Sequence, residues 1–119
     1  MIIHQPEIIQ TDGYAILWSR IEMAIQRDHF PDYLWYRVPE CYTSYLSTQS
    51  DSFLVASLLA GMYYGENIQV RGTVSPRLAY HLDEYQFLLN FRKPDVVRPV
   101  SIQYEHLAST EVTATAVGT

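Results

Sequence analysis

Four polar residues near the middle of the chain have side chains that could bind an anion: Arg71, Ser75, Arg77 and His81. Arg71 and Arg77 flank the sequence GTVS, which leads into a helix-like pattern. A helix N-terminus exposes free N–H groups, and two nearby guanidinium groups would favour a bound anion. Ser75 and Pro76, however, also suit a helix start as N-cap and first residue. This corner is therefore either an anion or substrate site of a small enzyme or binding domain, or an ordinary capped helix.

The remaining reactive side chains form no catalytic set. His81 and Glu84, three residues apart, would share a helix face, but two ligands are only half of a metal site. Asp28 and His29 could act as an acid–base pair, yet both are common loop residues. Cys41 has no neighbour that would favour a thiolate. Because phosphate-binding glycine motifs are also missing, we predict no catalytic residue, no metal and no cofactor.

Composition places the chain among single globular domains. It has 119 residues, of which 48% are hydrophobic and 18% charged, and its formal net charge is −5. A negative charge argues against nucleic-acid binding, and ten tyrosines suggest a surface that meets another protein. One cysteine excludes an intrachain disulfide, and no signal-peptide pattern or bilayer-spanning apolar stretch occurs. We predict a cytoplasmic protein that binds no membrane.

Apolar periodicity and turn residues predict an α+β domain with two layers and the order β-β-β-α-β-α-β. Thr11-Asp12-Gly13 predicts the turn of an N-terminal antiparallel hairpin. The two helices have Ser50 or Asp51 and Ser75 as candidate N-caps, and the first ends near Gly65. A last strand is expected to end near Tyr104, and the mixed-sheet domain is expected to span residues 1–106. The later elements, in order, are a strand at 33–39, a helix within 47–67, a strand at 67–74, a helix at 75–91 and a strand at 96–104.

Exposed apolar residues predict self-association. The first helix is apolar around most of its circumference and should be covered on more than one side. Trp18 and Trp35 alternate with Leu17 and Leu34, which places the tryptophans on the other face of their strands. Uncovered apolar patches of this kind mark association surfaces. The predicted interface residues are Trp18, Trp35, Phe53, Leu59 and Met62.

The segments SDSFLVA, LLAGMYYGE and VRGTVSPRLAYHL carry a family resemblance. They resemble the N-terminal region of uncharacterised bacterial proteins whose later part is a PP-loop domain of the ATP-pyrophosphatase, asparagine-synthase-like type. The similarity covers about half of the chain and includes no Ser-Gly-Gly-x-Asp-Ser loop, so it transfers no catalytic residue. It implies a non-catalytic accessory domain whose partner is an adjacent PP-loop domain.

Residues 107–119, which close with EVTATAVGT, have no periodic apolar face. We predict that they form a linker toward an ATP-using domain; a frayed terminus is the alternative.

Overall fold

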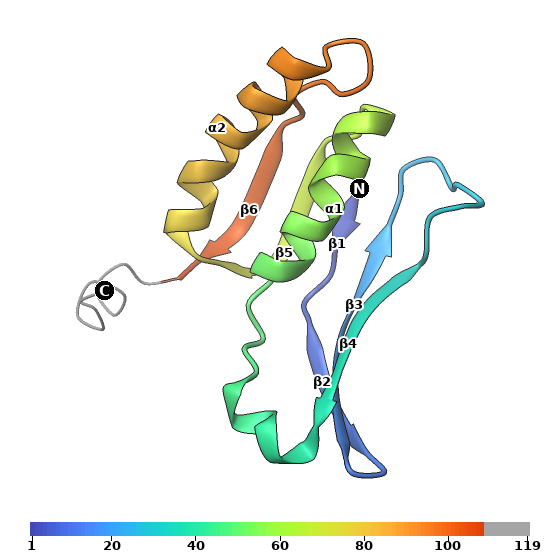
Figure 1. Ribbon diagram of the computed structural model, residues 1–119, viewed down its shortest axis with the longest axis vertical. Coiled ribbons are helices and arrows are strands. Elements are labelled where there is room, and N and C mark those ends of the chain that lie inside the picture. The colour runs from blue at the N-terminus through green and yellow to red at the C-terminus, as the bar shows by residue number, and fades with distance from the viewer. Residues whose placement is uncertain (109–119) are drawn as a thin grey trace.

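A computed structural model describes residues 1–108, which form a six-stranded mixed sheet with two α-helices on one face (Figure 1). This confirms the predicted α+β fold. None of the described helices is both long and apolar enough to cross a membrane. The strands are β1 (Ile2–Ile3), β2 (Glu7–Thr11), β3 (Tyr14–Glu22), β4 (Tyr33–Pro39), β5 (Ile68–Val74) and β6 (Ile102–Leu107). The helices are the 3-10 helix η1 (Glu40–Tyr45), α1 (Asp51–Tyr64) and α2 (Pro76–Arg92).

β3 organises the N-terminal half of the sheet. It pairs antiparallel with β4 along one edge, and with both β1 and β2 along the other. β1 and β2 pair one after the other along the same edge of β3. The pairing shifts by one residue between them, because Ile3 stands opposite Ile21 whereas Glu7 stands opposite Trp18. β1 was not predicted, because two residues are too few to show alternation. β5 joins β1 and β6 in parallel, which makes the sheet mixed.

Local side chains fix where α1 begins and ends. Ser50 occupies the N-cap position, but its side chain makes no capping hydrogen bond. The carboxylate of Asp51 instead accepts a hydrogen bond from the Ser75 N–H at 2.9 Å, which ties the start of α1 to the start of α2. Gly65 ends α1 with φ 71°, the left-handed conformation expected of a glycine in this position.

The start of α2 agrees with its sequence pattern. The Ser75 hydroxyl accepts a hydrogen bond from the Leu78 N–H at 3.2 Å, and Pro76 is the first helical residue. Farther along, Gln86 is buried and bonds to both backbone groups of Val100, whose N–H donates at 2.7 Å and whose carbonyl accepts at 3.2 Å. These bonds attach α2 to the segment that leads into β6.

The core lies between the helices and the inner face of the sheet. On β5, Ile68, Val70 and Val74 are buried, whereas Arg71 between them is exposed. Because successive strand residues point to opposite faces, the buried set faces the helices and Arg71 faces away from them. The buried hydrophobic residues of α1 that complete this core are Phe53, Leu54, Leu58 and Met62.

α1 was expected to be covered on more than one side. Within one copy its outer residues Val55, Leu59 and Tyr63 are 49%, 52% and 59% exposed, so a second cover from another protein surface stays a prediction. One expected element boundary was wrong. The last strand was expected to end near Tyr104, yet β6 continues to Leu107 through its pairing with β5. The predicted linker at 107–119 lies outside the described residues from 109 onward.

Candidate interaction surface

The predicted anion-binding corner is not assembled. Arg71 lies on the sheet face opposite the helices, where its Nε is 3.7 Å from the carboxylate of Glu105. Arg77 and His81 belong to α2 in the other layer, so the sheet separates them from Arg71. Ser75 is occupied as the cap of α2. These four residues therefore do not share a pocket.

His81 is also unsuited to metal binding in this arrangement. Its Nδ1 is 3.8 Å from the carboxylate of Glu84, and both side chains are more than half exposed. Among the residues that the structure describes, no three His, Cys, Asp or Glu side chains are placed to hold a metal ion. His81 and Glu84 form a solvent-facing pair on α2, the simpler of the two sequence interpretations.

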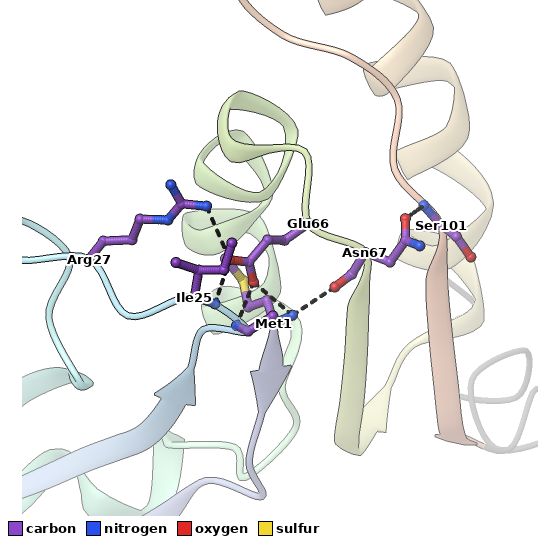
Figure 2. A network of polar contacts seen from close by, with 7 residues as sticks. Met1, Ile25, Arg27, Glu66, Asn67 and Ser101 are labelled. Atoms are coloured by element: carbon purple, nitrogen blue, oxygen red, sulfur yellow. Dashed lines mark hydrogen bonds and ion pairs between the residues drawn. The ribbon is translucent and has the colours of Figure 1, made fainter.

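The most buried ionic network joins the first residue of the chain to Glu66, just after α1 (Figure 2). The carboxylate of Glu66 is 3.1 Å from the Met1 ammonium and accepts hydrogen bonds from the N–H groups of Ala24 and Ile25 at 2.8 and 3.3 Å. Arg27 approaches it to 3.5 Å. Glu66 is only 7% exposed, so it is held almost entirely by these protein groups.

The electrostatics of Glu66 indicate a structural role. Burial alone raises the pKa of this carboxyl, but the hydrogen bonds from Ala24 and Ile25 and the Met1 ammonium together outweigh burial. The pKa of Glu66 consequently lies below its ordinary value of 4.5. A carboxylate that is fully paired with donors and stays ionised is a poor proton acceptor, so we assign Glu66 to holding β1, the loop after β3 and the end of α1 together.

A cluster of large apolar side chains covers the open face of the sheet, the face away from the helices. Trp18 stands directly opposite Trp35 in the pairing of β3 with β4, and Ile9 stands opposite Ile16 in the pairing of β2 with β3. Tyr33 packs against Trp18 with ring centroids 5.5 Å apart. These residues line a shallow depression of about 480 Å³. We call the five residues Ile9, Ile16, Trp18, Tyr33 and Trp35 the aromatic face.

Side chains of both charges border the aromatic face. Glu22 accepts a hydrogen bond from His4 at 2.9 Å and lies 3.2 Å from Arg20. The His4 hydrogen bond is the largest effect and lowers the pKa of Glu22; burial opposes it, and the Arg20 charge lowers this pKa further. At the other end, the guanidinium of Arg37 lies 4.5 Å above the Tyr14 ring. The border is thus polar and balanced in charge, as at the rim of a protein interface.

A second apolar surface lies on the outer side of α2. Phe87, Phe91, Leu88 and Tyr80 are 68%, 76%, 57% and 70% exposed. Because they belong to the helix layer, they face away from the aromatic face on the opposite side of the domain. We call these four residues the α2 surface.

The five predicted interface residues fall into three places. Trp18 and Trp35 belong to the aromatic face, as their alternation with Leu17 and Leu34 suggested, and Leu59 is exposed on α1. Phe53 and Met62, in contrast, are 0% and 1% exposed and belong to the core, so they offer no surface to a partner. The helix pattern alone did not tell which apolar side of α1 lies on the sheet.

Several residues of the two surfaces were not predicted. They are Ile9, Ile16, Tyr33 and the four residues of the α2 surface. The first three could have been found by extending the alternation of Trp18 and Trp35 across the neighbouring strands.

Comparisons of this chain with known protein families, curated proteins and solved structures find no match. The PP-loop association therefore remains a prediction from sequence motifs.

Proposed function

We propose that the chain is a non-catalytic interaction domain that binds other protein surfaces. The observation that carries the proposal is the aromatic face, where Trp35 and Tyr33 are 58% and 51% exposed beside Trp18. Burying aromatic side chains is a large source of binding free energy, and tryptophan and tyrosine are enriched at the centres of protein interfaces. A contiguous group of them with a charged rim supports a binding surface.

The charge of the chain favours a protein over a nucleic acid as the ligand. Exposed aromatic rings on a sheet can stack on nucleotide bases, but such proteins surround the rings with a basic groove. Here Arg20 is paired with Glu22 and Arg71 with Glu105, so two arginines of the open face have a carboxylate partner, and the third, Arg37, lies over the Tyr14 ring. The formal net charge of −5 opposes a polyanion further.

The sequence resemblance suggests which proteins these surfaces serve. It supports a PP-loop, ATP-using domain as the neighbour of this domain, and the two surfaces on opposite layers also allow association with a second copy. Cys41 is exposed and free of any disulfide, which fits a reducing compartment. On these grounds we also propose that the protein is cytoplasmic.

Three measurements test this function. Sedimentation velocity should show self-association of the 119-residue chain up to about 0.5 mM. Where the reading frame continues past codon 119, the polypeptide it encodes should bind this chain in trans. The chain alone should release no pyrophosphate from ATP. A chain that stays monomeric and binds no such polypeptide, or that hydrolyses ATP, would overturn the proposed function.

A further inference from the structure

β4 forms an edge of the sheet that is unusually open to pairing. Within the described chain it pairs with β3 alone, so its other side is free (Figure 1). Protein edges are commonly protected by inward-pointing charges, bulges or central prolines. β4 has an unbroken register with β3, its inner-facing residues are Leu34, Tyr36 and Val38, and its proline, Pro39, is the last residue. β2 and β6, which also border the sheet, are shorter, with five and six residues.

The backbone groups of β4 alternate between its two sides. The Glu40 N–H donates to the Gly13 carbonyl, and the Ile21 N–H donates to the Asp32 carbonyl, both at 2.8 Å. Both pairs continue the register of β3 with β4, so the even-numbered residues of β4 direct N–H and C=O toward β3. The odd-numbered residues with a free N–H and C=O on the open side are Tyr33, Trp35 and Arg37.

A second copy of β4 can form hydrogen bonds with all of these free N–H and C=O groups in one register. If two copies run antiparallel about a twofold axis at Trp35, Trp35 pairs with its own copy and Tyr33 pairs with Arg37. Pro31 and Pro39 then stand opposite each other, and neither has an N–H to leave unpaired. If the register shifts so that Pro39 stands opposite Tyr33, the Tyr33 carbonyl loses its donor. We propose that β4 pairs in this Trp35-centred register with β4 of a second copy, which joins two sheets into one.

The side chains agree with this register. The one charged side chain of β4, Arg37, would lie beside the Tyr33 ring of the second copy rather than beside another arginine. A guanidinium near a tyrosine ring is attracted to its face, as Arg37 already is to Tyr14. On the inner side Leu34 would meet Tyr36, so no charge is buried. The twofold axis also extends the aromatic face from one copy onto the next.

This inference rests on the proposed function and narrows it: the partner is a second copy, and the contact is the β4 edge. Residue-resolved hydrogen exchange of the full chain tests it at low and high protein concentration. The amides of Tyr33, Trp35 and Arg37 should exchange freely in dilute solution and become protected as the chain associates. The amides of Leu34 and Tyr36 should be protected throughout, because they donate toward β3, and they serve as the internal reference.

Two variants at one position separate the backbone contact from the side chain. Trp35→Pro and Trp35→Thr both remove the indole, but only proline removes the N–H. Since the Trp35 N–H points away from β3, proline leaves the pairing with β3 intact. Each dimer loses two central hydrogen bonds, so Trp35→Pro should dimerise at least about tenfold more weakly than Trp35→Thr. Unchanged protection of Tyr36 in both variants would establish that both remain folded.

Each outcome bears on the inference. Protection of the three amides together with loss of the dimer in Trp35→Pro supports it. A wild-type dimer in which these amides stay exposed, or which Trp35→Pro leaves intact, overturns it and leaves the proposed function standing through another surface. A wild-type monomer at about 0.5 mM also overturns it. In that case the proposed function depends on binding the polypeptide encoded after codon 119.

Discussion

Replacing Glu66 by glutamine tests whether the ionic network around Met1 holds three parts of the fold together. Glutamine has nearly the same shape but lacks the charge, and its amide group has one acceptor oxygen in place of two. The second position becomes an NH₂ group that faces donors: the Met1 ammonium and the Ala24 N–H at one oxygen position, or the Ile25 N–H and Arg27 at the other. The variant therefore replaces an attraction by an unfavourable donor–donor contact in a site that is 7% exposed.

The expected loss of stability is the cost of breaking the ion pair, reduced by the hydrogen bond that glutamine can still accept. Removing one partner of a buried ion pair costs about 3–5 kcal/mol, because the other charge stays buried without compensation. The glutamine oxygen keeps one hydrogen bond, which contributes about 1 kcal/mol. We expect Glu66→Gln to lower the free energy of unfolding by about 2–4 kcal/mol. Glu84→Gln is the matched control: this side chain is 68% exposed, and its change should stay within about 0.5 kcal/mol.

The same site predicts how stability depends on pH. The pKa of Glu66 is lower in the folded chain than its ordinary value of 4.5, so the unfolded chain binds more protons near that pH. Stability from this group is therefore complete above the ordinary value and is lost as the pH falls through the lowered pKa. The lowered pKa of Glu22 acts in the same direction. Glu66→Gln removes the contribution of Glu66 and should flatten the acid side of the profile.

Urea unfolding at a series of pH values, followed by tryptophan fluorescence, measures both effects. The wild type and the Glu84→Gln control should lose stability together between about pH 6 and pH 3, and Glu66→Gln should lose less over that range. A loss below about 1 kcal/mol at neutral pH, with an unchanged pH profile, would refute the assignment of Glu66 as a structural anchor.

Further predictions concern caps and packing. Ser75→Ala should lower the free energy of unfolding by about 1 kcal/mol, and an unchanged value would show that its hydroxyl does not cap α2. Gly72→Ala should cost about 1–3 kcal/mol, because its Cβ would overlap the buried Ser50 hydroxyl; an unchanged urea midpoint would contradict that contact. Phe53→Ala should cost about 3–5 kcal/mol, while Phe91→Ala, at a site 76% exposed, should stay within about 0.5 kcal/mol; equal losses would contradict the placement of α1.

Elements with their own local chemistry could be predicted from the sequence. The hairpin turn uses positive φ at Asp12 and Gly13, and α1 ends on positive φ at Gly65, where the sequence patterns placed these features. Ser75 caps α2 by a contact only three residues away. In each case the signal and the structure involve the same few residues.

Features that depend on distant contacts could not be predicted in this way. The burial of Glu66 depends on the ammonium of Met1, far from it in the sequence, and on a loop after β3, which no local pattern records. The interpretation of Arg71 and His81 as one corner failed for a different reason. They are close in sequence, but on β5 Arg71 follows the buried Val70 and therefore points to the face of the sheet away from the helices. That alternation was visible in the sequence and should have outweighed proximity.

The positions of the two exposed surfaces determine what an edge-to-edge dimer could do. Pairing through β4 uses backbone groups at the rim of the sheet. It would bring Tyr33 and Trp35 beside the second copy, but it would use neither the rest of the aromatic face nor the α2 surface. Since α2 covers the face of the sheet opposite the aromatic face, the two copies would present one widened aromatic face on one side and two separate α2 surfaces on the other. A bivalent partner, with two sites for the α2 surface, could then engage both copies at once, which raises its effective affinity without any new kind of contact. Self-association through β4 and the binding of another protein to the α2 surface are consequently compatible, because different layers of the same domain carry them.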